Sequence, residues 1–267
     1  VVSAAVSLLY YCAPDSYITS VVKPLISLLY RSSGVAATTL ASILSICSNP
    51  VNREVFMPHI FHFFVMRRDS LQVRKIKLKI LALISNKENI NIIMSRFAKY
   101  ASTSEHEFAS FAVKMMGRIA SSKLDTIDTV FNVLIKLIGR TEGKVLNEVV
   151  FNISCLLRLR GTEDQSEALK QLCKKFVIVK DHEARAAIIS IVGDMYEAHQ
   201  AYAPQLLQYV ARDIENESAE VKLQSLTLSA KLIACGYEKK EVPMYVLQIC
   251  QQDEEFDIRD RARFLLC

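Results

Sequence analysis

The sequence contains no tryptophan, and glycine and proline are scarce, at 7 and 6 of 267 residues. The glycines are scattered, so no glycine-rich phosphate-binding loop is present. No GxSxG or comparable nucleophile turn occurs either. No run alternates apolar and polar residues long enough to predict a β-sheet. The sequence therefore favours an all-α chain without a recognisable catalytic motif.

Long apolar runs are also missing. The longest falls far short of the roughly 20 residues that a membrane-spanning helix needs. The seven cysteines form no CxxC pair, and several occupy apolar helical positions. We therefore expect free, buried thiols in a reducing compartment rather than a disulfide framework.

Residues with metal-binding or catalytic chemistry do not cluster. His59 and His62 form an HxxH, which places both rings on one helix face, but no further ligand accompanies them. Asp253, Glu254 and Glu255 form an acidic turn that we expect to be solvated. The sequence thus predicts no metal, no cofactor and no catalytic residues, and we do not expect an enzyme.

What the sequence does contain is a repeat. In Lys144 to Arg158 the apolar residues recur at three- and four-residue steps, as on the buried side of an amphipathic helix. The same pattern occurs seven times, at steps of 35–39 residues. We call the first apolar residue of each copy its marker, and the markers are Val35, Val73, Phe108, Val145, Ala184, Val221 and Ile258.

A second, shorter apolar helix is expected between successive marker helices. Proline is tolerated in the first turn of a helix, and Pro24 and Pro58 fit that position. The expected second helices are Pro58 to Met66, Ile90 to Tyr100, Thr129 to Ile138, Glu167 to Phe176, Pro204 to Ile214 and Pro243 to Cys250.

Most marker helices are preceded by a residue that can cap them. A hydroxyl or carboxylate oxygen at that point can accept from the free N–H groups of the first turn. Ser104 with Glu107 also fits a capping box. The expected caps are Ser32, Ser70, Ser104, Thr141, Asp181 and Ser218.

A two-helix unit of about 35–40 residues is typical of HEAT and armadillo arrays. One pair cannot bury its apolar face alone, so the pairs must stack. The sequence therefore predicts an all-α, HEAT/armadillo-like helical solenoid. We expect a single domain over residues 1–267 with about seven two-helix repeats, and we interpret both ends as cut from a longer chain.

Positive charge is concentrated in the first third of the chain. Residues 1–100 hold 12 Lys and Arg against 4 Asp and Glu, whereas residues 201–267 hold 8 against 11. The densest basic stretch could be a solvated face or could meet phosphate, acidic lipid or an acidic partner. This candidate basic patch comprises Arg67, Arg68, Arg74, Lys75, Lys77 and Lys79.

Three stretches resemble the trunk of the beta-adaptins. FDIRDRARFL, from Phe256 to Leu265, is similar to a motif with a D-[IL]-R-D-R core near the end of such trunks. AEVKLQSLTLSAKL, from Ala219 to Leu232, resembles the preceding repeat, and KIKLKILALISNKENI, from Lys75 to Ile90, resembles an earlier one. Within the family, the similarity is greatest to beta subunits of type-3 heterotetrameric adaptor complexes.

The resemblance implies a structural large subunit of a vesicle-coat adaptor, which sorts cargo from Golgi and endosomes to the lysosome or vacuole. The implied partners are the medium, small and second large subunits, with an Arf-family GTPase as an additional candidate. The chain would be cytoplasmic and would associate peripherally with Golgi, endosomal and vesicle membranes through the complex. No nucleic-acid partner is expected, because no aromatic residues are interleaved with the basic patch.

Within the DIRDR motif, Asp257 is expected at a helix start, where its charge opposes the positive end of the helix dipole. Arg259, Asp260, Arg261 and Arg263 form a candidate partner surface, although ion pairing within the array is the favoured interpretation of these four residues. The alternative function is another helical-repeat scaffold. It could be the COPI beta subunit, a different beta-adaptin or a transport-receptor-type solenoid.

Overall fold

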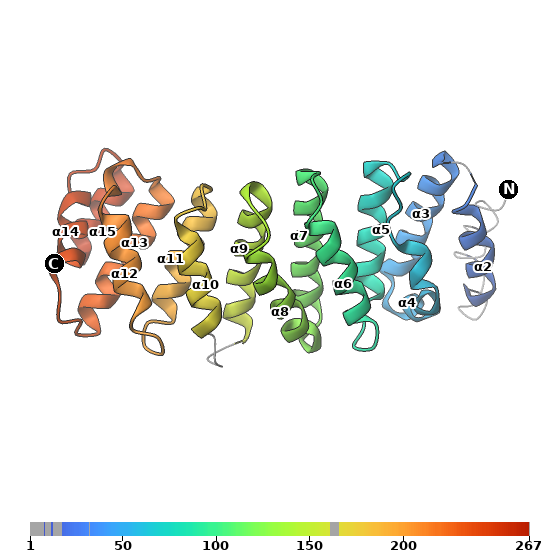
Figure 1. Cartoon of the computed structure of the whole chain (residues 1–267), viewed down its shortest axis with the longest axis horizontal. Helices are drawn as coiled ribbons and strands as arrows, with labels where there is room; N and C mark the ends of the chain where they lie inside the picture. The colour runs from blue at the N-terminus through green and yellow to red at the C-terminus, as the bar shows by residue number, and fades with distance from the viewer. Residues whose placement is uncertain (1–7, 9–11, 13–17, 32, 161–165, 267) are drawn as a thin grey trace. The chain divides into compact units, whose positions relative to one another are not determined.

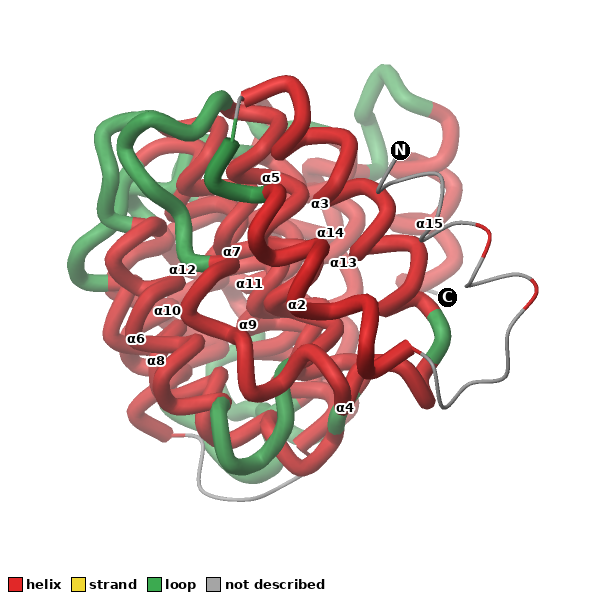
Figure 2. Tube along the Cα trace, turned by 90° about the vertical axis from the view of Figure 1, so that its right-hand side faces the viewer, coloured by secondary structure: helices red, strands yellow, loops and turns green. Residues whose placement is uncertain are grey.

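The computed structural model describes residues 8, 12, 18–31, 33–160 and 166–266. All regular secondary structure in this described part is helical, and short connectors join the helices (Figure 2). The all-α prediction is confirmed. The chain divides into two compact units, Val1–Val133 and Leu134–Cys267.

In the first unit, the marker helices α3, α5 and α7 pack in succession against one another, and the shorter elements lie beside them (Figure 1). The helix α8 (Ile127–Ile138) spans the division between the units. The other elements are α2 (Ile18–Leu28), α3 (Ser33–Ser48), η2 (Pro50–Asn52), α4 (Arg53–Phe56), η3 (Met57–Phe63), α5 (Leu71–Ile84), α6 (Ile90–Ala101), α7 (His106–Ser122) and η4 (Leu124–Thr126).

In the second unit, α9 packs on α11, α11 on α13, and α13 on α15. The helices α10, α12 and α14 lie beside this row and contact it (Figure 1). The elements of this unit are α9 (Gly143–Arg160), α10 (Ser166–Phe176), α11 (His182–Asp194), α12 (Tyr202–Ala211), η5 (Ile214–Asn216), α13 (Ala219–Ala234), α14 (Glu241–Cys250) and α15 (Phe256–Leu266).

The cores consist of the apolar stripes that the periodicity predicts. In α9, Val149, Ile153 and Leu156 are fully buried. In α13, the equivalent stripe includes Ser225 and Ser229, which are also fully buried. Each of these two hydroxyls donates to the carbonyl oxygen four residues earlier, so their burial leaves no unpaired donor.

Two of the expected helix caps form as predicted. The Ser70 hydroxyl accepts from Val73 N at the start of α5, and the Asp181 carboxylate accepts from Ala184 N at the start of α11. Ser218 is the N-cap of α13 but makes no capping hydrogen bond. The expected cap Ser32 lies outside the described residues.

The other two expected caps are wrong. The N-cap of α7 is Glu105, without a side-chain capping bond, so the capping box of Ser104 with Glu107 does not form. Thr141 is buried and donates backwards to the carbonyl oxygen of Leu137. The following helix, α9, begins two residues later at Gly143, whose φ of +56° suits glycine.

Two proline predictions also need correction. Pro24 was predicted to lie in the first turn of a helix. It lies inside α2 instead, because that helix begins six residues earlier, at Ile18. The predicted helix from Pro58 to Met66 is a 3-10 segment, η3, which ends at Phe63 and is interrupted at His59 (φ −105°, ψ 17°). The predicted single solenoid over residues 1–267 requires the two units to form one continuous array, and it stays a prediction.

No single helix in the described ranges combines the length and apolarity needed to cross a membrane. One bent pair, Gly34–Ser48 with Pro50–Phe63, meets those requirements jointly but turns by 117° at its break.

Candidate functional site

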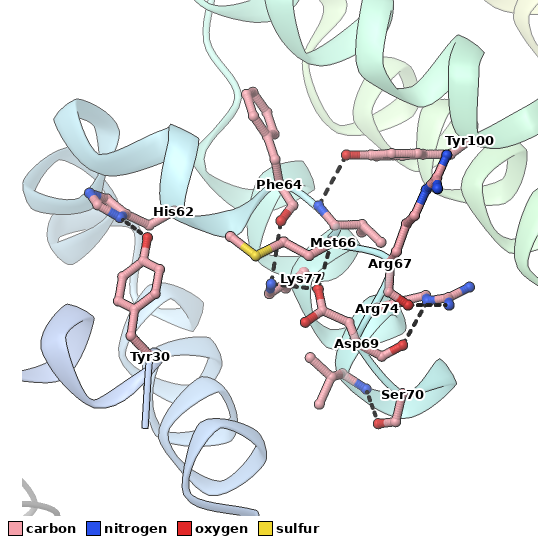
Figure 3. Close-up of polar contacts among 12 residues, drawn as sticks. Tyr30, His62, Phe64, Met66, Arg67, Asp69, Ser70, Arg74, Lys77 and Tyr100 are labelled. Carbon is pink, nitrogen blue, oxygen red and sulfur yellow. Dashed lines mark hydrogen bonds and ion pairs between the residues drawn. The ribbon is translucent and has the colours of Figure 1, made fainter. Parts of the chain in front are cut away.

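In the first unit, the connector before α5 is organised around Asp69 (Figure 3). Its Oδ2 accepts from Lys77 Nζ at 2.6 Å and from the backbone N–H of Met66 at 2.8 Å. Lys77 Nζ also donates to the carbonyl oxygen of Phe64 at 3.3 Å. Both charged side chains are nearly inaccessible, at 6% and 11% exposed, and each has its hydrogen-bond partners. The pair therefore fixes the connector on α5.

Arg74, in the first turn of α5, joins this connector to the following repeat. Its guanidinium donates to the carbonyl oxygens of Asp69 at 2.8 Å and Arg67 at 3.3 Å. It also forms an ion pair with Glu105, before α7, at 2.7 Å. The guanidinium carbon Cζ also lies over the Phe108 ring, 5.6 Å from its centre. One arginine thus contacts its own connector, the next connector and the next marker residue.

The helix α6 holds the same connector from the other side. The Tyr100 hydroxyl accepts from the backbone N–H of Val65 at 3.0 Å, as Figure 3 shows. Burial raises the pKa of Tyr100, although the bond from Val65 opposes that shift. Arg96 stacks over the ring of Phe64 at 4.9 Å. The aromatic side chains here position backbone rather than face a ligand.

The candidate basic patch is therefore divided by the fold. Lys77 is buried, Arg74 is mostly covered, and Lys75 pairs with Glu107 of the next repeat. The remaining three, Arg67, Arg68 and Lys79, are exposed. Only these three remain as a candidate binding surface, and that role stays a prediction.

The stretch Lys75 to Ile90 contains a second connecting device at its end. Asn86 N–H donates to Asn89 Oδ1 at 2.7 Å, and Asn89 N–H donates to Asn86 Oδ1 at 2.9 Å. Asn89 Nδ2 also donates to the last carbonyl oxygen of α5, at Ile84. The asparagine pair thus closes α5 and fixes the turn that leads into α6.

Lys123, after α7, reaches the same helix end from the next repeat. Its Nζ donates to the carbonyl oxygens of Ala82, Leu83 and Ser85 and to the Ser85 hydroxyl. A lysine at a helix C-terminus also opposes the negative end of the dipole. Burial, followed by the charge of Arg53, lowers the pKa of Lys123 to about 8. The ammonium therefore remains charged near neutral pH.

In the second unit, Arg185 repeats the role of Arg74. Its guanidinium forms an ion pair with Glu217, before α13, and donates to the carbonyl oxygen of Val179 at 3.3 Å. The two charged side chains are 11% and 13% exposed. Arg185 also stacks over the ring of Phe176 at 4.3 Å. Its partners come from its own connector, the next connector and the neighbouring helix.

Lys222, on α13, makes the corresponding bridge to the last repeat. Its Nζ lies 2.7 Å from Asp253 Oδ2, with side chains 12% and 11% exposed. Burial alone raises the pKa of Asp253, but bonds from Lys222 and from the backbone N–H groups of Glu255 and Glu254 outweigh it, so the net shift is downward. Asp253 is thus a paired carboxylate, not part of a freely solvated acidic turn.

These bridges follow one rule, which the sequence analysis missed. The residue after the marker is basic at Arg74, Arg185 and Lys222, and its carboxylate partner lies 31 or 32 residues further on. We call the three pairs the inter-repeat ladder. A search for basic and acidic residues at one repeat spacing could have found it.

A second connection lies at the opposite ends of the marker helices of this unit. Asp194, the last residue of α11, pairs with Lys231 of α13, and its other oxygen lies 3.8 Å from Arg158 of α9. Arg158 also donates to the Ser190 hydroxyl at 2.8 Å. Asp194 therefore links three successive marker helices, although its half-exposed position makes each pair weak.

The candidate partner surface lies on α15. Arg259 donates to the carbonyl oxygen of Asp253 at 3.1 Å and stacks over Phe256 at 4.6 Å. Arg261 donates to the Thr227 hydroxyl at 3.3 Å. Asp260 and Arg263 are exposed, and Phe264 is 78% exposed beside them. The surface carries charged and aromatic groups of the kind used in protein contacts, and its role stays a prediction.

Within the described ranges, no group of three or more His, Cys, Asp or Glu residues could hold a metal ion. His62 instead shares a 2.6 Å hydrogen bond with the Tyr30 hydroxyl (Figure 3). The described cysteines are free, but only Cys47 and Cys250 are fully buried, and Cys12 and Cys235 are exposed. Burial raises the pKa of Cys47 to about 12, which keeps it a thiol and a poor nucleophile.

Comparison with known proteins gives the same architecture a family context. The whole chain, residues 1–267, matches the family described as Adaptin N terminal region. It is 30% identical over 266 residues to the AP-3 complex subunit beta-1 of Bos taurus, covering 99% of this chain and 24% of that protein. It is also 30% identical over 285 residues to the AP3-complex subunit beta-A of Arabidopsis thaliana, covering 99% and 28%.

The fold also has a counterpart among known structures. A chain of a homology model of the full-length AP-3 complex, in an intermediate open conformation, aligns with a TM-score of 0.73 and 22% identity. The alignment covers 99% of this chain and 48% of that chain. This likeness confirms the helical-solenoid fold class. The chain spans only about a quarter of the length of the curated relatives named above.

Proposed function

This chain belongs to the adaptin family, and on that premise we propose that it is part of the β-type large subunit of a type-3 heterotetrameric adaptor complex. The observation that carries the proposal is the 30% identity, over 99% of the chain, to β subunits of AP-3 complexes from an animal and a plant. The subunit would sort cargo into vesicles bound for the lysosome or vacuole.

The proposed role is structural rather than catalytic. Several of the charged pairs join one repeat to the next, as at Arg74, Arg185 and Lys222. Such joints give a stiff scaffold on which other subunits can be positioned. The proposed partners are the medium, small and second large subunits, with an Arf-family GTPase as a further one. The complex would act in the cytoplasm, on Golgi and endosomal membranes and on vesicles.

The exposed groups of α15 are our candidate for the contact with the medium subunit. Neither Arg261 nor Arg263 forms an ion pair with a carboxylate in the described part of the chain. Phe264, the next residue along the chain, is largely exposed. A rim of arginines around an exposed aromatic residue is typical of interaction surfaces. We therefore propose that Arg259, Asp260, Arg261 and Arg263 take part in subunit assembly.

Co-expression with separately tagged subunits tests both parts of this proposal. We expect the chain to retain the type-3 medium subunit in preference to the medium subunits of other adaptor classes and to the corresponding COPI subunit. Reversing two rim charges, Arg261→Glu with Arg263→Glu, should weaken retention by about tenfold or more. The matched control is Lys114→Glu with Arg118→Glu, two exposed positions on α7.

The outcomes separate the family role from the assigned surface. Retention of the type-3 medium subunit that is indifferent to the α15 reversals would keep the adaptor role and remove this surface. Preferential retention of a COPI subunit, or of another class of medium subunit, would overturn the type-3 assignment. A folded, helical chain that retains no adaptor subunit would overturn the proposed function.

A further inference from the structure

A groove in the second unit lies between the connectors that precede α11 and α13. Its lining includes Val177 and Val179 after α10, together with Tyr209 of α12 and residues that follow it. Its volume of about 420 Å³ falls within the roughly 300–1,000 Å³ range of ligand-binding clefts. The groove can therefore accommodate several side chains of another molecule.

The apolar wall of this groove is exposed although the fold has fixed it in place. Val177 is 58% exposed and the adjacent Ile178 is 52% exposed. Tyr209 is 38% exposed, and its ring meets Phe176 edge-on at 5.8 Å. Phe176 is itself buried beneath the guanidinium of Arg185. A preformed apolar wall of this kind requires little reordering when it binds a partner.

The rim of the groove carries positive charge that the fold does not use. Lys180 and Arg212 are exposed lining residues, and neither side chain forms an ion pair or hydrogen bond with the described part of the chain. Arg185, by contrast, is committed to Glu217 in the floor. The other lining carboxylate, Asp213, accepts from Asn216 at 2.6 Å. The cations of the lining that remain available are therefore Lys180 and Arg212.

The first unit has a smaller groove, of about 110 Å³. It lies between the connectors that precede α3 and α5, and its lining includes Arg31 and Arg68. Both arginines are exposed, and neither guanidinium has a partner within the described ranges. Each unit thus presents one cation from each of two successive connectors.

We propose that the groove of the second unit binds an extended peptide segment in which acidic side chains alternate with large apolar ones. The acidic groups would pair with Lys180 and Arg212, and an apolar side chain would rest against Val177 and Tyr209. Asp213 and Glu217 in the same lining disfavour dense phosphate charge, so a peptide fits better than a lipid headgroup or nucleic acid. The proposal does not depend on which adaptor complex the chain serves.

Fluorescence anisotropy on the 267-residue chain tests the proposal with a defined probe. The probe is the fluorescein-labelled peptide Gly-Glu-Leu-Glu-Phe-Glu-Gly. We expect saturable binding, which Lys180→Glu combined with Arg212→Glu weakens by about tenfold or more. Tyr209→Ala should also weaken it, since that change removes part of the apolar wall. A probe with lysines in place of the glutamates should not bind.

The controls distinguish this groove from general surface charge. Lys174→Glu with Lys239→Glu makes the same change in net charge at two exposed positions outside the groove, and it should leave the affinity unchanged. Circular dichroism confirms that each variant is folded. Absence of saturable binding, equal loss in the control pair, or displacement of the probe by phosphatidylserine vesicles as effectively as by unlabelled peptide would each overturn the proposal.

Discussion

Lys123 shows how a side chain from one repeat completes a helix of another. It donates to carbonyl oxygens of Ala82, Leu83 and Ser85 at the end of α5, which have no later turn of helix to bond to. We expect Lys123→Met to lower the free energy of unfolding by about 1–3 kcal/mol. Lys114→Met, at an exposed position of α7, should change it by less than about 0.5 kcal/mol. Urea unfolding followed by circular dichroism measures both.

The same residue gives a pH signature. Its pKa in the folded chain is lowered to about 8, whereas an unfolded lysine titrates near roughly 10.4. Between these values the unfolded state binds more protons, so the Lys123 contribution to the free energy of unfolding rises with pH. The difference in stability between wild type and Lys123→Met should therefore grow from pH 8 to 10. A difference that stays flat or shrinks would contradict the assigned pKa.

The ladder pairs should be coupled more strongly than surface ion pairs. Lys222 and Asp253 are both largely covered, whereas Lys87 and Asp125, at 2.9 Å, are 69% and 64% exposed. A double-mutant cycle with Lys222→Met and Asp253→Asn should give a coupling energy of about 1–3 kcal/mol. The same cycle at Lys87 and Asp125 should give about 0.5 kcal/mol or less. Equal coupling in the two cycles would show that burial contributes nothing to the ladder.

The pH dependence of this pair has the same sign as that of Lys123, but it falls at acidic rather than alkaline pH. The pKa of Asp253 is lower in the folded chain than its ordinary value, so the unfolded state takes up the proton first as pH falls. The contribution of Asp253 is therefore present above about pH 4 and is lost below it. Asp253→Asn should reduce the acid sensitivity of unfolding in that window.

At the residue scale, the sequence predicted which side chains are buried better than which are bonded. The stripe through Val149 and Ile153 is buried as its spacing required. The partners of Lys123 are backbone carbonyl oxygens 38–41 residues away, which no residue pattern marks. Lys77 looked like one more surface cation, because nothing in its own helix shows that Asp69 folds back onto it.

At the scale of the element, α11 and α13 approach each other closely at Gly193. A Cβ built there would lie 3.2 Å from Leu228 Cδ1, closer than an ordinary van der Waals contact. Gly34, near the start of α3, has open space around the equivalent atom. Alanine is the better helix former by about 1 kcal/mol in a helix interior. The two glycines therefore offer a matched comparison of helix propensity against packing.

We expect Gly34→Ala to stabilise the chain by about 0.4–1 kcal/mol. Gly193→Ala should show no such gain, because Leu228 must move to admit the new methyl group. Thermal and urea unfolding of the two variants against wild type measure the difference. If Gly193→Ala stabilises the chain as much as Gly34→Ala does, the contact between α11 and α13 is looser than the structure shows.

Element boundaries were less predictable than element type. The helix predicted from Lys144 to Arg158 is α9, Gly143–Arg160. This prediction succeeded because the long apolar stripe defines a single buried face of the helix. The stretch from Pro58 to Met66 is apolar with no clear period, and it forms a 3-10 segment whose backbone departs from helical geometry at His59. Where Ser104 offered a cap, the chain starts α7 at His106 instead.

At the scale of the whole chain, positive charge is concentrated in the first unit, but much of it is used within the fold. Arg74, Lys75 and Lys77 each have a carboxylate partner. The charge left for partners lies at connectors, as at Arg68 and Arg212, and on α15. This distribution fits a scaffold that meets other proteins through local surfaces. It does not fit a continuous basic track of the kind that follows a nucleic-acid backbone.

The measurement that tests the adaptor assignment most directly is the mass of the species formed when this chain is co-expressed with a type-3 medium subunit. Light scattering after size exclusion gives that mass independently of shape. We predict a complex of one 30.1 kDa chain with one medium subunit, stable through the column. A folded chain that elutes alone, or only with further copies of itself, would contradict its role as part of an adaptor large subunit.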